Sequence, residues 1–146
     1  MTSFGNWEFT CDLARTCAAY AQVKHGSSEN CDCNGCRNFV RVRDTAFPDK
    51  FLRLLENLGI DPQKDGEIFH CAQLSPGRHS YGGWFHFVGT LEKTGDFAPI
   101  ELGEGFIAWL CHSSAPALSR LKGLPLVQVE FNAENIPWLL NEPEPQ

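Results

Sequence analysis

Three cysteines lie within six positions of one short segment, CDCNGC: Cys31, Cys33 and Cys36. Cysteine thiolates are common zinc ligands, and the two-residue gap between Cys33 and Cys36 lets one turn bring both sulfur atoms to the same side. A structural zinc site is tetrahedral, so these three residues need a fourth ligand from elsewhere in the chain. The sequence therefore predicts a structural zinc site that contains the three cysteines.

The fourth ligand must be a histidine or a more distant cysteine. The main candidates are His25, His70, Cys71, His86 and Cys111, followed by Cys11 and Cys17. Among them we favour His86, because it follows two glycines in the segment YGGWFHF. Glycines in a strand let another backbone approach closely. On this interpretation the ion ties the cysteine turn to the sheet, and the protein is a binding or assembly module.

The same cysteines also fit a thiol enzyme. If Cys33 begins a helix, the helix dipole lowers the pKa of its thiol, and Cys36 is the resolving thiol of a dithiol oxidoreductase. No alternating pattern of parallel strands and helices surrounds the pair, so a thioredoxin-like fold is not indicated. In a third interpretation the thiols are unreactive, since free cysteine is often a small buried apolar residue.

Two neighbouring pairs, His70–Cys71 and Cys111–His112, suggest a Cys-His hydrolase as a second type of thiol enzyme. Adjacent residues of a strand point to opposite faces, so such a pair would have to form between strands. Small apolar filling is the simpler interpretation of these two cysteines. The catalytic residues, if there are any, are not identified by the sequence.

Arginines follow the cysteines directly. Arg37 and Arg41 share one face if residues 34–44 are helical, and such a patch can contact phosphate or an acidic partner. Nearby acidic residues make a solvated helix face the simpler interpretation. With 12 lysines and arginines against 18 acidic residues, the net charge is −6, which argues against broad nucleic-acid binding. The partner, a protein or a small molecule, is not specified, and neither is the oligomeric state.

Length and composition bound the class of protein. The chain has 146 residues, which fits one domain over residues 1–140 with a disordered, proline-rich tail over residues 141–146. No apolar run reaches 18 residues and the first residues do not resemble a secretory signal, so we expect a cytoplasmic protein without a membrane span. Seven cysteines, an odd number, argue against a disulfide framework.

Hydrophobic patterns indicate the elements that position the cysteines. Alternation predicts strands over residues 6–13, 16–25, 66–74, 79–93, 105–113 and 124–134, the third and fourth forming a hairpin. A helical pattern covers residues 47–62, with Pro48 at its start and Gly59 at its end, and a shorter helix is expected over 34–44. The expected fold is α+β: a mostly antiparallel sheet of five or six strands, with one or two helices inserted in the middle of the chain.

Three segments, CDCNGCRNF, FPDKFLRLLENLGIDP and YGGWFHFVG, together resemble a group of small bacterial proteins without an assigned function. The resemblance covers most of residues 30–90 and, more loosely, the segment VQVEFNAENIPW. It implies an intact bacterial domain and transfers no activity or catalytic residue. Cys11, Cys17, Cys71 and Cys111 lie outside these segments.

Overall fold

The computed structural model describes residues 2–93 and 98–146. Its elements, in chain order, are β1 (Thr2–Phe4), β2 (Trp7–Cys11), α1 (Leu13–Ala21), the 3-10 turn η1 (Ser28–Asn30), α2 (Asn34–Ala46), α3 (Asp49–Leu58), β3 (Glu67–Ser75), β4 (Arg78–Lys93), β5 (Ile100–Gly103), β6 (Phe106–His112) and β7 (Leu126–Pro137).

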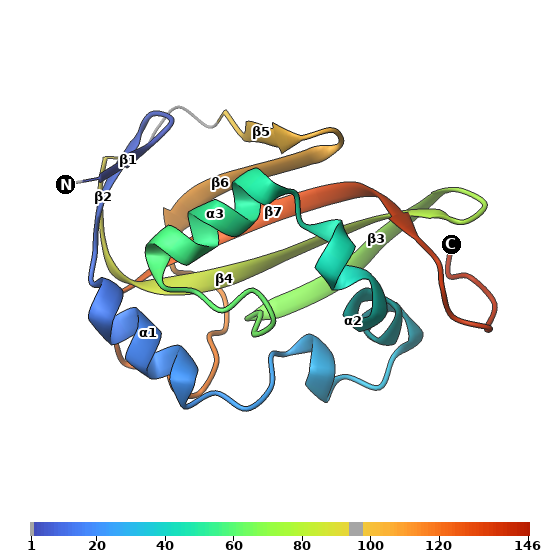
Figure 1. Cartoon of the computed structure of the whole chain (residues 1–146), viewed down its shortest axis with the longest axis horizontal. Coiled ribbons are helices and arrows are strands. Elements are labelled where there is room, and N and C mark those ends of the chain that lie inside the picture. Colours follow the sequence, from blue (N-terminus) through green and yellow to red (C-terminus); the bar gives the residue numbers. More distant parts are fainter. Residues whose placement is uncertain (1, 94–97) are drawn as a thin grey trace.

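Within these described residues, seven strands form one antiparallel sheet (Figure 1). The strand order is β1-β2-β4-β7-β6-β5, and β3 also pairs with β4. Strand β4 is 16 residues long, so its first part pairs with β3 and its last part with β2, while β7 runs along its other side. The predicted α+β class and the mostly antiparallel sheet are confirmed.

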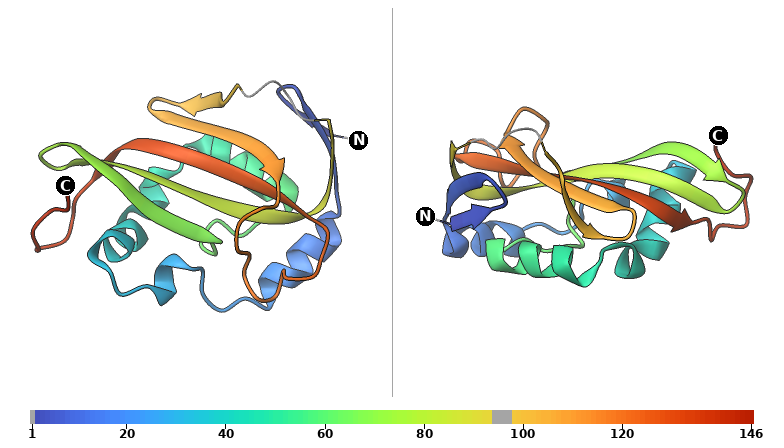
Figure 2. Two further views of the ribbon diagram at one scale, coloured as in Figure 1. Left: turned by 180° about the vertical axis from the view of Figure 1, so that it is seen from behind. Right: turned by 90° about the horizontal axis from the view of Figure 1, so that it is seen from above.

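The helices gather on one face of the curved sheet (Figure 2). Alternation along β4 turns Phe85 and Phe87 toward them, and both side chains are completely buried. Phe47, before α3, and Phe51, within it, pack their rings against aromatic rings of the sheet, including Phe85 and Phe131. This aromatic layer joins α3 to the centre of the sheet.

Helix α3 begins and ends where the sequence predicts. Pro48 occupies the N-cap position, and Asp49 in the first turn complements the positive end of the helix dipole. Gly59 ends the helix in the left-handed conformation with φ of 79°, which glycine adopts without steric strain. The buried residues Phe51, Leu55 and Leu58 form its apolar stripe.

The strand predicted over residues 16–25 is wrong, because this segment belongs mainly to helix α1. Asp12 caps the helix: its carboxylate accepts a hydrogen bond of 3.0 Å from the backbone N–H of Arg15. Thr16 and Tyr20, four positions apart, are the buried residues of α1, whereas Cys17 is exposed. The alanines of this segment favour a helix and give a strand little side chain to pack.

Two further strands, β1 and β5, have no counterpart in the predicted set. The single-domain prediction covers residues 1 and 94–97, which lie outside the described part of the chain, and it stays a prediction. The tail predicted to be disordered, residues 141–146, contains no helix or strand, but two of its carboxylates contact the rest of the protein. Among the described helices, none is long and apolar enough to cross a membrane.

Candidate metal centre

The three predicted cysteines meet at the start of helix α2. Their sulfur atoms all lie within 4.8 Å of one another, and the Sγ atoms of Cys31 and Cys33 are 3.2 Å apart. Sulfur atoms around one tetrahedral zinc ion are separated by about 3.8 Å, given a Zn–S bond of about 2.3 Å. The cluster is therefore compact enough to hold one metal ion with small adjustments.

Helix α2 makes two of these cysteines chemically different. Cys33 is the exposed N-cap residue, and its sulfur accepts a hydrogen bond of 3.4 Å from the backbone N–H of Cys36. Partial burial raises the pKa of Cys33, but hydrogen bonds from the N–H groups of Cys36 and Gly35 and from the other two thiols outweigh it and lower the pKa. Cys36 is buried, and burial followed by the neighbouring thiols raises its pKa.

Residues of β3 and β4 pack against the cysteine turn. Cys36 Sγ lies 3.9 Å from the carbonyl oxygen of Ile68 in β3, and Tyr81 of β4 donates a hydrogen bond of 2.9 Å to the carbonyl oxygen of Gly35. Asn38 of α2 donates to the carbonyl oxygen of Pro137 and accepts from the backbone N–H of Leu139, at the end of β7. These contacts fix the first turns of α2 against the β3–β4 hairpin and the end of β7.

Arg37 links the cysteine turn to the tail of the chain. Its Nε donates a hydrogen bond of 3.0 Å to the carbonyl oxygen of Asp32, which lies between two of the cysteines. Its two terminal nitrogens form a bidentate ion pair with Glu142, at 2.5 and 2.9 Å. One guanidinium group thus holds both segments.

The predicted arginine patch is partly neutralised within the chain. Arg37 pairs with Glu142, and Arg43 pairs with Glu29 at 2.8 Å. Arg41 is exposed. A role for Arg37 and Arg41 in binding a partner stays a prediction, and Arg37 would first have to release its carboxylate.

His86, which we favoured as the fourth ligand, is not a member of the sulfur cluster. Alternation along β4 turns Phe85 toward the helices, so His86 takes the opposite face, whereas the cysteines approach from the helical side. Its Nε2 is 3.1 Å from Oε1 of Gln128, and its Nδ1 is buried without a hydrogen-bond partner among the described residues. The assignment of His86 stays a prediction that this geometry does not favour.

Burial of His86 should make the stability of the protein depend on pH. Burial lowers its pKa, against the opposing effect of the hydrogen bond with Gln128. The folded state therefore binds this proton less readily than the unfolded chain, whose histidine pKa is about 6.5. The free energy of unfolding is fully retained above that pKa and falls as the pH drops below it, by up to about 1.4 kcal/mol per pH unit.

Urea unfolding at about pH 7.5 and about pH 5.5 measures this dependence. We expect wild-type protein to lose more stability between the two conditions than the His86→Gln variant, because the glutamine side chain does not titrate in this pH range. Equal losses in both proteins would show that His86 does not contribute.

The two strand cysteines that neighbour a histidine, Cys71 and Cys111, give a Cys-His hydrolase no support. Burial raises the pKa of Cys71. Burial and the adjacent Glu130, 3.6 Å from the sulfur, raise the pKa of Cys111 to about 12. Both thiols are therefore kept protonated, which is the opposite of what a nucleophile needs.

Sequence reasoning missed a chain of polar groups close to the cysteines. His79 is completely buried, with Nδ1 2.8 Å from Nε2 of His70 and Nε2 2.7 Å from a carboxylate oxygen of Glu144. His70 was one of several candidate ligands, but His79 and Glu144 were not considered. The even–odd alternation around Phe85 could have counted against His86 as a ligand, whereas contacts made by a tail far along the chain leave no local pattern in the sequence.

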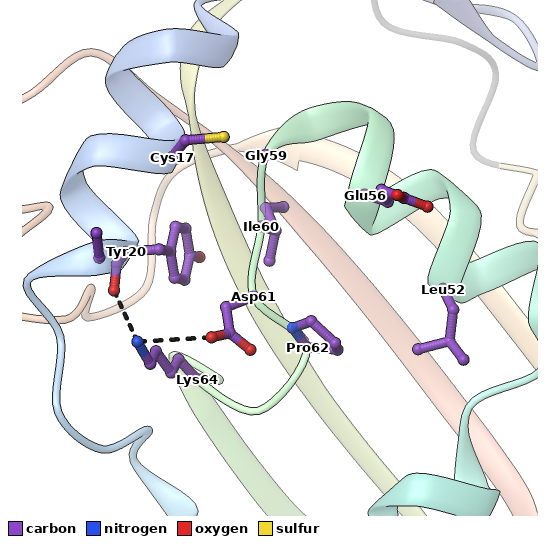
Figure 3. A pocket seen from close by; sticks show the side chains of 10 residues that line it. Cys17, Tyr20, Leu52, Glu56, Gly59, Ile60, Asp61, Pro62 and Lys64 are labelled. Atoms are coloured by element: carbon purple, nitrogen blue, oxygen red, sulfur yellow. Dashed lines mark hydrogen bonds and ion pairs between the residues drawn. The ribbon is translucent and has the colours of Figure 1, made fainter.

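A hollow of about 540 Å³ lies elsewhere, between α1 and α3, lined by Cys17, Tyr20, Ala21, Leu52, Glu56, Gly59, Ile60, Asp61, Pro62 and Lys64 (Figure 3). Lys64 reaches across it, donating a hydrogen bond of 2.9 Å to the carbonyl oxygen of Tyr20 and pairing with Asp61 at 3.5 Å. Its ammonium group is thus already engaged within the chain. The cysteine cluster is the better candidate site, because its side chains converge on one point.

No protein-family model, curated protein or solved structure matches this chain.

Proposed function

We propose that this protein binds one zinc ion through the thiolates of Cys31, Cys33 and Cys36. The proposal rests on one observation: three sulfur atoms within 4.8 Å of one another at the start of α2. Thiolate ligands favour zinc among the common divalent ions of proteins. The bound ion fixes the turn before α2 against the β3–β4 hairpin, and the protein then serves as a binding or assembly module.

Elemental analysis of protein purified without chelator tests this proposal. We expect about one zinc per chain in the wild type and much less than one in Cys33→Ser, because losing one of three thiolates removes a strong ligand. Cys17→Ser is the matched control, since Cys17 is an exposed cysteine outside the cluster and its variant should keep the metal. Wild-type protein without metal, or Cys33→Ser with a full equivalent, would contradict the proposal.

The second candidate is a dithiol oxidoreductase. It is favoured by the placement of an exposed thiol, Cys33, as the N-cap of α2 and a buried thiol, Cys36, one turn later. In that role the Cys33 thiolate would attack a substrate disulfide, and Cys36 would then displace the substrate thiol and close a Cys33–Cys36 disulfide. Rapid labelling of one thiol at neutral pH in metal-free wild-type protein would support this candidate, whereas a full zinc equivalent in the purified protein would oppose it.

A further inference from the structure

A network of three hydrogen-bonded side chains lies next to the cysteine turn. It runs from Glu144 in the tail through the buried His79 of β4 to His70 of β3. His79 also packs its ring against Trp138, with the ring centres 5.2 Å apart. Two imidazoles and a carboxylate in this order do not belong to the apolar core, and they are not needed to pair the strands.

The strand register places His70 on the same face as the cysteines. His70 is paired with Tyr81, whose hydroxyl bonds to the carbonyl oxygen of Gly35 in the cysteine turn. A Cβ atom placed on Gly35 would stand 3.4 Å from Cβ of His70. His70 is thus packed directly against Gly35, one of the two residues between Cys33 and Cys36.

The chain of hydrogen bonds selects one tautomer of each neutral histidine. The ionised carboxylate of Glu144 only accepts, so His79 carries its proton on Nε2 and offers Nδ1 as an acceptor. His70 must then donate through Nε2, which leaves its Nδ1 without a proton. Metal-binding histidines commonly donate their other ring N–H in this way to a partner that fixes the ring.

We infer that Nδ1 of His70 is the fourth ligand of the metal site, with His79 and Glu144 as positioning residues. This inference rests on the proposed zinc site. The imidazole of His70 is not part of the group of sulfur atoms within 4.8 Å, so the ion draws Cys31–Cys33 toward β3. Cys31 and Asp32 lie between η1 and α2, and Cys33 is the N-cap of α2, so this shift moves the connecting segment and the cap while residues 34–46 stay in place. The result is a closed shell of three sulfurs and one nitrogen, typical of a structural site.

X-ray absorption at the zinc edge of the full-length wild-type protein tests the ligand set directly. We expect a shell of three sulfurs and one nitrogen with the scattering pattern of imidazole, and loss of that pattern in His70→Gln. His86→Gln is the matched control and should keep it. Circular dichroism of each variant shows that the comparison is made on folded protein. A wild-type spectrum without an imidazole ligand overturns the inference even if His70→Gln fails to fold.

His79→Gln tests the positioning role. We expect the imidazole ligand to remain, while zinc affinity measured by competition with a chromophoric chelator falls about 10–100-fold, as for other partners of metal-bound histidines. A purely structural role for His79 would lower the melting temperature of the metal-free protein and leave zinc affinity unchanged.

The outcomes separate this inference from the proposed function. Zinc bound by three sulfurs and an oxygen, or an imidazole signal that survives in His70→Gln, would overturn the role of His70 and leave the zinc proposal intact. Protein that binds no zinc at all would overturn both.

Discussion

Replacing Cys36 by serine should lower the melting temperature of the protein in the presence of zinc by about 8–16 °C. A ligand present at about 1,000 times its dissociation constant stabilises the folded state by about 4 kcal/mol. For a domain of this size each kcal/mol shifts the melting temperature by about 2–4 °C. Cys36 is the buried member of the cluster, and serine matches its size without supplying a thiolate.

Chelator treatment of the wild-type protein shows how much of the effect of Cys36→Ser comes from lost zinc and how much from altered packing at position 36. Wild-type protein treated with chelator should melt close to Cys36→Ser, and the variant should not respond to either zinc or chelator. Differential scanning calorimetry measures both. The exposed-cysteine variant Cys17→Ser should respond to zinc as the wild type does. A wild-type melting temperature that is the same with zinc and with chelator would show that the ion does not stabilise this fold.

Replacing Phe51 by alanine should destabilise the protein by about 3–5 kcal/mol whether or not metal is bound. Phe51 is fully buried in α3, and its ring contacts those of Phe47, Phe85, Phe106 and Phe131. Its removal opens a cavity at the point where α3 meets the sheet. Urea unfolding in excess chelator measures the change without any contribution from zinc.

The matched control is Phe69→Ala, the same chemical change at a position that is 44% exposed. Phe69 packs over the sheet against Trp84, so we expect a smaller loss, of about 1 kcal/mol. Zinc should raise the melting temperatures of Phe51→Ala and wild type by similar amounts, because distant sites contribute additively. Equal losses for Phe51→Ala and Phe69→Ala would contradict the layered core described above.

The fold was predictable where one periodicity dominates. Alternation around Phe85 and the stripe that contains Phe51 and Leu55 identify β4 and α3, and the SPGR turn identifies the hairpin. Helix α1 was misassigned because its alternating apolar residues also fit a strand, although the cap at Asp12 and the four-residue spacing of Thr16 and Tyr20 were present in the sequence. Strands β1 and β5, with three and four residues, are too short to show a period.

Only the part of the site formed by residues close together in the sequence could be predicted. The spacing of Cys31, Cys33 and Cys36 is written in the sequence, and helix α2 follows it as expected. The proximity of His70 to the cysteine turn depends on strand pairing in the β3–β4 hairpin, whose register shifts after His70 and again after Gln73. Such irregularities are set by the packed structure and leave no pattern in the sequence, whereas the two glycines before His86 are visible there and led to its selection.

Arg37 donates hydrogen bonds both to the carbonyl oxygen of Asp32 and to the carboxylate of Glu142. The segment around Glu142 is therefore coupled to the cysteine turn. We therefore expect a change in the cysteine turn to alter the contact between Arg37 and Glu142, two residues before Glu144, whose carboxylate bonds to His79. An affinity tag fused after Gln146 is therefore not a neutral addition to protein intended for metal studies.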